Sequence, residues 1–136
     1  MIYLLDTNTC IRLLNEDRNS AVSRRLAMIH LGDVTICSVV QAELYWGAFK
    51  SSRRDSNLAR LERFFSEFPS LPFDDQSAII YGQIRAGLAA SGTPIGSNDL
   101  LIASIALANN LILVTHNTRE FSRVQGLRLE DWEIEV

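Results

Sequence analysis

The sequence predicts an α/β fold with a mainly parallel sheet, and two observations support this prediction. Short apolar runs with no helical spacing, which are typical of buried strands, occur at residues 2–5, 34–37 and 111–114. Longer segments whose apolar residues recur at helical spacing separate these runs. Strands that alternate with helices form parallel sheets with right-handed crossovers, so the carboxyl ends of these strands are expected to meet at one edge.

The first apolar run ends at Asp6, which Thr7 and Asn8 follow. In open parallel sheets ligands bind at the carboxyl edge, and this makes Asp6 a candidate functional residue. Asp6 could equally cap the helix that is expected from about Thr9 to Asn15. This stretch by itself leaves both interpretations open.

A second helix is expected from about Ser20 to Leu31, ahead of a turn and the strand at residues 34–37. Ser38 is then expected to cap a further helix that continues to about Lys50. This order again places a helix directly after a buried strand.

Glu43 lies in the middle of the helix after Ser38, with Val39, Val40 and Gly47 on the same side at helical spacing. The carboxylate is therefore expected to point inward. A buried charge without a partner is costly, so the side chain would need a cation nearby. The alternative is an ordinary surface glutamate.

Residues 50–68 form the most basic region of the chain and include a helix rich in leucine and phenylalanine. A charge run of this kind is either a solvated face or a surface that contacts RNA. The basic residues concerned are Lys50, Arg53, Arg54, Arg60 and Arg63. After an extended segment at 71–73, Asp74 and Asp75 are expected as N-terminal caps of a helix that ends near Ala90.

Turn-forming residues at 91–99 lead into an apolar helix at 100–108, which must be buried and which has Asp99 in its first turn. The helix dipole favours an acid there, and this is the structural alternative for Asp99. The strand at 111–114 then ends in Thr115, His116 and Asn117. The remainder is expected to hold a short helix, an edge strand around 132–134 and four solvated acids, namely Glu130, Asp131, Glu133 and Glu135.

Composition is that of one globular domain of 136 residues, with 47% hydrophobic and 21% charged residues. The net charge of −3 argues against broad electrostatic coating of nucleic acid, although a local basic stripe could still hold a phosphate backbone. Cys10 and Cys37 lie in apolar contexts without CxxC spacing and are expected to be reduced core thiols. Neither a leader segment nor a membrane span is recognisable, so a cytoplasmic protein is expected.

Three carboxylates are expected to converge at the carboxyl edge of the sheet. Asp6 ends a strand, Glu43 lies on the helix after the second strand, and Asp99 begins a helix that precedes another strand. Inward carboxylates that share a site need a cation, and ligand sets made only of oxygen atoms favour Mg²⁺ or Mn²⁺ over zinc.

Four blocks in this order resemble the signature blocks of PIN-domain ribonucleases, and more narrowly those of the VapC toxins of bacterial toxin–antitoxin pairs. They are MIYLLDTN at 1–8, SVVQAELYWGA at 38–48, IGSNDLLIA at 95–103 and LVTHNTREF at 113–121. The resemblance covers essentially the whole chain. It implies one PIN domain over residues 1–136, folded as a three-layer α/β/α sandwich around the parallel sheet.

The resemblance also implies a magnesium-dependent endoribonuclease in which Asp6, Glu43 and Asp99 bind the metal and Mn²⁺ could substitute. Many PIN domains place a fourth acid just after the last core strand, where the counterpart in this chain is Asn117. The expected supporting residues are Thr7, Asn8, Asn98, Thr115 and Asn117. His116 could act as a general acid or contact RNA, or it could be structural. The substrate could be a tRNA or an rRNA.

The partners implied by the resemblance are a second copy of the chain, forming a homodimer, and a small VapB-like antitoxin that wraps a groove. Large aromatic residues of two helices are a hypothesis for that groove, with packing between the helices as the alternative. They are Tyr45, Trp46, Phe49, Phe64, Phe65 and Phe68.

Three rival interpretations remain. Asp6-Thr7-Asn8-Thr9 resembles the start of a haloacid-dehalogenase-like phosphatase, and receiver domains also gather acids around Mg²⁺. Both rely on a lysine beyond the middle of the chain, whereas the lysine of this chain is Lys50. The third interpretation is an inactive PIN fold that serves as a binding module.

Overall fold

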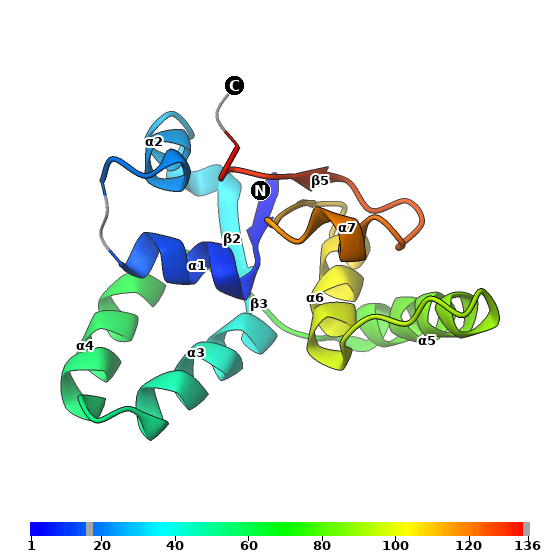
Figure 1. Cartoon of the computed structure of the whole chain (residues 1–136), viewed down its shortest axis with the longest axis horizontal. Helices are drawn as coiled ribbons and strands as arrows, with labels where there is room; N and C mark the ends of the chain where they lie inside the picture. Colours follow the sequence, from blue (N-terminus) through cyan, green and yellow to red (C-terminus); the bar gives the residue numbers. More distant parts are fainter. Residues whose placement is uncertain (16–17, 135–136) are drawn as a thin grey trace.

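The computed structural model describes residues 1–15 and 18–134 of the chain. The sheet has five strands in the order β3-β2-β1-β4-β5, and every neighbouring pair is parallel (Figure 1). The strands are β1 (Tyr3–Leu5), β2 (Val34–Cys37), β3 (Ser70–Leu71), β4 (Ile112–Val114) and β5 (Leu129–Glu130). The parallel sheet predicted from the sequence is confirmed.

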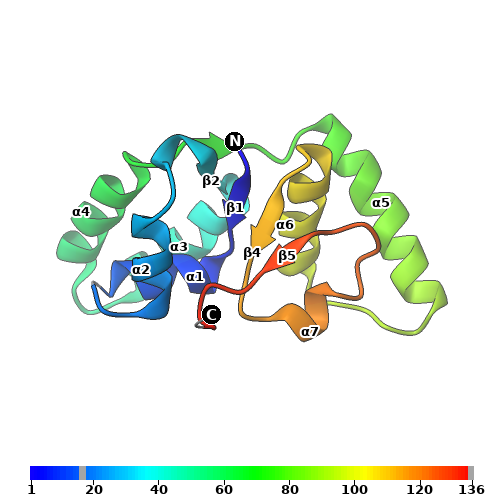
Figure 2. The ribbon, with the colours of Figure 1, turned by 90° about the horizontal axis from the view of Figure 1, so that it is seen from above.

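Helices flank this sheet on two sides, with α1, α2 and α4 on one side of the strands and α5 and α6 on the other (Figure 2). The helices are α1 (Thr7–Leu14), α2 (Ala21–Ala27), α3 (Ser38–Lys50), α4 (Arg54–Phe65), α5 (Asp75–Ala90), α6 (Ser97–Ala108) and α7 (Thr118–Phe121). This is the three-layer α/β/α arrangement that the resemblance implied.

The core is built on β1, which lies between β2 and β4. Leu4 and Leu5 have no exposed surface, and the same holds for their partners Leu113 and Val114 on β4. The buried residues of α6 are Leu100, Ile102, Ala103, Ser104, Ile105 and Ala106. Because both faces of a parallel sheet are covered, its strands are apolar without alternation, and the helix expected to be buried is indeed buried. Among the described residues, none of the helices combines the length and the apolar character needed to cross a membrane.

The cysteines match their prediction. Cys10 and Cys37 are free thiols and both are fully buried. Burial raises the pKa of Cys10 well above its usual range and raises that of Cys37 to about 11. Neither thiol is therefore a nucleophile at neutral pH.

The helix expected from Ser20 to Leu31 is shorter than predicted. Ser20 caps it by accepting a hydrogen bond from the Ser23 amide at 3.1 Å, but α2 ends at Ala27 and a 3-10 helix spans Leu31–Asp33. Met28 is 78% exposed, so the apolar residues beyond α2 add little burial that would extend the helix.

Ser38 does not cap α3, as the sequence had suggested. β2 ends at Cys37 and α3 begins at Ser38, so Cys37 occupies the N-cap position and no side chain caps the helix. With no residue between strand and helix, a serine has no loop position from which to accept the amide hydrogen bond. By contrast, Asp74 does cap α5 as predicted, accepting from the Ser77 amide at 2.9 Å.

The last strand was predicted in the wrong place. β5 spans Leu129–Glu130 and pairs with β4, whereas the stretch around residues 132–134 is a turn. Trp132 is only 3% exposed and packs edge-on against Tyr3, with ring centroids 5.3 Å apart. The aromatic residue that suggested a strand is an anchor that closes the C-terminal segment over the core.

Three C-terminal acids were expected to be solvated and are instead partly buried in ion pairs. The pairs are Glu130 with Arg25 (3.3 Å), Asp131 with His116 (3.0 Å) and Glu133 with Arg12 (3.2 Å). The prediction failed because the side chains that pair with these acids lie far away in the sequence. Glu135 lies outside the described residues.

Most aromatic residues of the proposed antitoxin groove pack between α3 and α4. The contacting ring pairs are Tyr45 with Phe65 (5.2 Å), Phe64 with Phe65 (6.1 Å) and Phe64 with Phe68 (5.0 Å). Phe68 is 3% exposed, whereas Trp46 and Phe49 are 67% and 52% exposed. Core packing thus accounts for four of the six aromatic residues, and Trp46 and Phe49 remain available to a partner.

We predict that Ile105→Ala lowers the free energy of unfolding by about 2–4 kcal/mol, because it leaves a cavity beside the sheet. Ile79→Ala is the matched control, since Ile105 on α6 has no exposed surface and Ile79 on α5 is 58% exposed. The control should change stability by about 0.5 kcal/mol or less. Urea denaturation of both variants measures the difference, and equal losses would contradict this core.

Candidate functional site

Asp6 lies at the carboxyl end of β1, where its amide donates to the Val114 carbonyl of β4 at 3.1 Å. The side chain is 5% exposed, and its Oδ1 accepts a hydrogen bond from the Thr9 amide at 2.9 Å. Asp6 is therefore the N-cap of α1, as one interpretation of the sequence proposed. The cap uses one carboxylate oxygen, so the other is free to bind a ligand.

Glu43 faces the start of α1 from the middle of α3. Its Oε1 accepts a hydrogen bond from the Thr7 hydroxyl at 2.7 Å, and the residue is half-buried. The sequence predicted a cation beside Glu43, but within the described residues its partner is the neutral Thr7 hydroxyl. This hydrogen bond joins residues that are 36 positions apart and brings the second acid to the first.

Asp99 occupies the first turn of α6 and is half-buried. Burial, and after it the negative charges of Glu120, Glu43 and Asp6, together raise its pKa from an ordinary 3.8 to about 6. These three carboxylates are near enough to repel Asp99. The structure thus brings together the three acids predicted from the sequence.

Glu120 is a fourth acid in this group, and the sequence argument missed it. It lies in α7, where one oxygen accepts the Gly96 amide and the other accepts the Asn117 side-chain amide, both at 2.9 Å. These two hydrogen bonds, in that order, lower the pKa of Glu120. A Cβ atom at Gly96 would lie 3.7 Å from Asp99 and 3.9 Å from Glu120, which places both carboxylates at the start of α6.

The sequence proposed Asn117 as the counterpart of the fourth acid. In the structure the side-chain amide of Asn117 donates a hydrogen bond to Glu120, which is itself the fourth acid. Thr115 is fully buried, and its Oγ1 accepts a hydrogen bond from the backbone N–H of Asn117 at 3.0 Å. This contact holds the turn after β4. The signal for Glu120 was present in the sequence, because a helical turn after a strand returns a residue three positions later to the same place.

The remaining supporting residues differ in their contacts. Thr7 holds Glu43 as described, whereas Asn8 and Asn98 are exposed in the first turns of α1 and α6. Within the described residues neither asparagine side chain makes a hydrogen bond. Asn98 directly precedes Asp99 and Asn8 lies two positions after Asp6, and the role of both stays a prediction.

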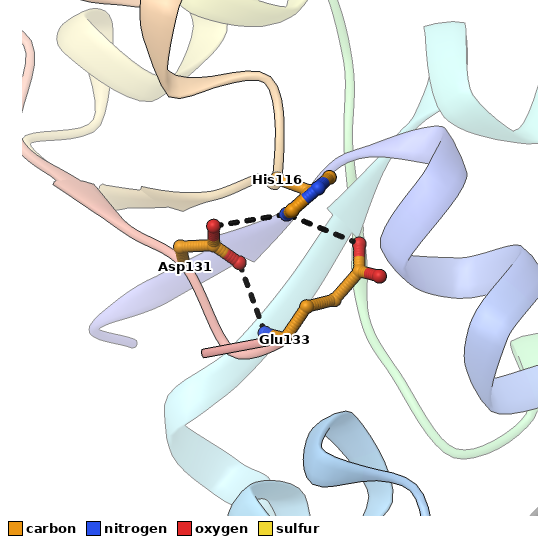
Figure 3. A group of neighbouring side chains, drawn as sticks. All are labelled: His116, Asp131 and Glu133. Atoms are coloured by element: carbon orange, nitrogen blue, oxygen red, sulfur yellow. Dashed lines mark hydrogen bonds and ion pairs between the residues drawn. The ribbon is translucent and has the colours of Figure 1, made fainter. Parts of the chain in front are cut away.

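His116 takes part in a separate cluster with Asp131 and Glu133 (Figure 3). Its Nδ1 lies 3.0 Å from Asp131 and 3.7 Å from Glu133. The ligand atoms of the cluster lie within 4.8 Å of one another, but the Arg12 guanidinium 3.2 Å from Glu133 already supplies a positive charge there. We interpret this cluster as an ion-pair network that ties the C-terminal segment to the turn after β4.

The carboxylates of Asp6, Glu43, Asp99 and Glu120 offer oxygen atoms, which are suitable ligands for a divalent cation. Within the described residues no three of them bring oxygen atoms within 4.8 Å of one another, although their charges are near enough to raise the pKa of half-buried Asp99 further than burial does alone. A bound cation would remove the repulsion and favour closer approach. Oxygen ligands without nitrogen or sulfur favour Mg²⁺ or Mn²⁺. The chain thus belongs to the class of proteins whose parallel sheet carries a candidate divalent-cation site of carboxylates at its carboxyl edge.

The comparisons with known proteins agree with this class. The family model described as "PIN domain" matches residues 3–127. Two curated relatives are a protein named Ribonuclease VapC2 from Rickettsia felis, 39% identical over 133 residues, and one named tRNA(fMet)-specific endonuclease VapC from Shigella flexneri, 45% identical over 130 residues. The alignments cover 98% of this chain and 99% of the first relative, and 96% and 97% for the second.

A crystal structure of DNA-bound VapBC from Salmonella typhimurium superposes with a TM-score of 0.91 and 42% identity, covering 97% of this chain and 98% of that chain. The chain therefore belongs to the PIN domain family and, within it, to the VapC proteins. This membership does not favour the phosphatase and receiver-domain interpretations.

We predict that in metal-free buffer the stability of the wild type falls relative to that of Asp99→Asn as pH rises from about 4 to about 7. The folded-state pKa of about 6 exceeds the ordinary 3.8, so the destabilisation is absent at low pH and complete above the folded-state value. Because Asp99 is half-exposed, we expect a change of roughly 1–2 kcal/mol.

Urea denaturation at several pH values measures this difference. Added Mg²⁺ should flatten the pH dependence of the wild type but not that of Asp99→Asn. Parallel pH profiles for the two proteins without metal would show that Asp99 is not crowded by the other acids.

Proposed function

We propose that this protein is a magnesium-dependent endoribonuclease, with Mn²⁺ as a substitute metal, and that it is the toxin of a toxin–antitoxin pair. The observation that carries the proposal is the gathering of Asp6, Glu43 and Glu120 around half-buried Asp99, near enough that their charges, after burial, raise its pKa. Membership of the VapC proteins supports RNA as the substrate. Two free, buried thiols support action in a reducing compartment such as the cytoplasm.

In this proposal Asp6, Glu43 and Asp99 hold the cation, and Glu120 completes the set on the α7 side. When bound, a divalent cation lowers the pKa of a water molecule and neutralises charge that develops on the phosphoryl oxygens. The chain contributes the positioning of its own acids. The Thr9 amide holds one oxygen of Asp6, and the Thr7 hydroxyl holds one oxygen of Glu43.

Glu120 is oriented by the Gly96 amide and by Asn117, which in turn is placed by Thr115. Neutral donors are suited to this task because they fix a carboxylate without cancelling its charge, whereas a lysine or an arginine would cancel it. The site therefore keeps its negative charge for a cation. Cleavage with a 5′-phosphate and a 3′-hydroxyl on the products is the expectation from the family.

A tRNA is the first substrate to test, since the relative from Shigella flexneri is named for one, and rRNA is the alternative. Cleavage sites mapped in total RNA after brief induction would choose between them. An inactive PIN fold that only binds RNA is the remaining rival, and it predicts binding without cleavage under any divalent metal.

The proposed partner is a VapB-like antitoxin, supported by the likeness to a VapBC complex. A cavity of about 220 Å³ between α1, α3 and α4 reaches Glu43, and its lining includes Leu44, Gly47 and Leu61. An inhibitory segment seated there would contact Glu43. A homodimer belongs to the same proposal, and the molar mass of the purified toxin from light scattering tests it.

We predict that Asp6→Asn abolishes RNA cleavage while the protein stays folded. Asparagine caps a helix about as well as aspartate, so the change removes a negative charge and leaves the cap in place. Cleavage of tRNA by pure protein in Mg²⁺ should fall by roughly 100-fold or more, and Asp99→Asn should behave alike.

The matched control is Asp75→Asn, which also changes an acid in the first turn of a helix but on exposed α5. It should cleave at the wild-type rate. Chelation of metal should stop the wild type, and Mn²⁺ should restore it. Wild-type protein that cleaves no RNA with any divalent metal would refute the proposed function.

We also predict that Glu120→Gln lowers kcat by roughly 10- to 100-fold and weakens Mg²⁺ binding, because the fourth carboxylate completes the ligand set. Glu62→Gln, an exposed change on α4, is the control for loss of one negative charge. Calorimetric titration with Mg²⁺ and single-turnover cleavage measure the two effects. Unchanged metal affinity would remove Glu120 from the site.

A further inference from the structure

An indole on α3 is exposed in a way that packing does not explain. Trp46 is 67% exposed, whereas Trp132, the other tryptophan of the chain, is 3% exposed. Phe49, one turn further along, is 52% exposed. Large aromatic side chains at the surface commonly mark a binding site, because their exposure is unfavourable until a ligand covers them.

Lys50, the only lysine of the chain, covers one face of this indole. Its Nζ lies 3.6 Å from the ring centroid, which is a cation–π contact. With one face covered and 67% of the residue still exposed, the opposite face must be open. The contact therefore restrains the ring and leaves a flat aromatic surface toward solvent.

Glu43, Trp46 and Lys50 lie on one face of α3. They occupy positions i, i+3 and i+7, which recur on the same side of a helix. At 1.5 Å per residue, Trp46 lies roughly 4.5 Å and Lys50 roughly 10 Å along the axis from Glu43. A strand of RNA whose phosphate lies at the acids would therefore pass the indole on leaving the site.

The cavity beside α1 and α4 lies on the other flank of Glu43. Besides Glu43, its α3 lining is Leu44, Gly47 and Ala48, and Trp46 is not part of it. The helix thus separates two surfaces next to the same acid. One is an apolar cavity between helices, and the other is an open ring with a cation.

Cations continue beyond Lys50 in the turn that leads to α4. Arg53 and Arg54 are exposed and line a hollow of about 540 Å³ with three serines and Asp55. The Arg54 Nε donates to the Phe49 carbonyl at 3.1 Å, which holds its guanidinium close to the end of α3. An aromatic ring followed by exposed cations is the combination that binds single-stranded nucleic acid, since bases stack and phosphates pair.

We propose that Trp46, restrained by Lys50, is a stacking subsite for an unpaired base of the RNA substrate next to the cleaved bond, and that Arg53 and Arg54 receive the adjoining phosphates. The inference rests on the proposed function for the nature of the substrate. It adds the requirement that this part of the substrate is single-stranded, because bases inside a duplex cannot reach the ring.

The test is a fluorescence titration of metal-free protein in chelator with a single-stranded oligoribonucleotide, which separates binding from cleavage. Stacking on Trp46 should quench the tryptophan emission. Trp46→Phe should abolish most of this quench while the emission of buried Trp132 remains as an internal reference. The same sequence annealed into a duplex should quench far less.

Affinity measured by filter binding provides the second readout. Trp46→Ala should weaken binding of the single strand by roughly 5- to 150-fold, with a smaller loss for Trp46→Phe and for Lys50→Gln. Met28→Ala is the matched control, since Met28 is 78% exposed and follows α2. It should bind like the wild type, and circular dichroism should show that every variant is folded.

Two binding results would overturn the inference. One is wild-type affinity of Trp46→Ala for the single strand, and the other is a Trp46→Ala effect on antitoxin binding with none on RNA. Failure of the proposed function looks different, because RNA binding with Trp46 quenching and no cleavage under any metal would refute the nuclease and retain the subsite. Cleavage by Trp46→Ala with wild-type KM and kcat would retain the nuclease and refute the subsite.

Discussion

Repulsion among carboxylates at one edge of the sheet is the constraint on which the site depends. Burial and the nearby charges of Glu120, Glu43 and Asp6 together raise the pKa of half-buried Asp99 to about 6. Such crowding costs stability unless a cation relieves it, and folding alone would not favour it. The apolar strands and α6 provide the stability that offsets this cost, since their central residues are fully buried.

The fold meets this constraint by holding each acid with neutral donors. Backbone amides of Thr9 and Gly96 contact Asp6 and Glu120, and the Thr7 hydroxyl contacts Glu43. These contacts fix the carboxylates and preserve their charge. The arginines near the C-terminal segment are used elsewhere, where Arg12 and Arg25 form ion pairs with Glu133 and Glu130 and His116 contacts Asp131. Structural ion pairs and the charged site are thus kept apart.

Helix α3 links the site to the surface on which a substrate would lie. Its inner face packs aromatic residues against α4, and Glu43 lies between an apolar cavity and the exposed ring of Trp46. One helix can therefore present the same acid to two different ligands from two sides. An inhibitor and a substrate that shared only Glu43 would compete at the metal and still be recognised by separate residues.

The sequence by itself determined the alternation of strands and helices, the buried α6, and Asp6, Glu43 and Asp99 as a group, because apolar spacing and strand-end position are local signals. It misplaced β5, gave Ser38 a capping role and treated Glu130, Asp131 and Glu133 as solvated. Only the tertiary structure decided these points and added Glu120. The pairing of β5 and the contacts of the four acids depend on partners distant in sequence, whereas Ser38 cannot cap α3 because the helix follows β2 without a loop. A sequence pattern indicates which side chains are apolar or charged, but the long-range contacts that bury or pair them form only when the chain folds.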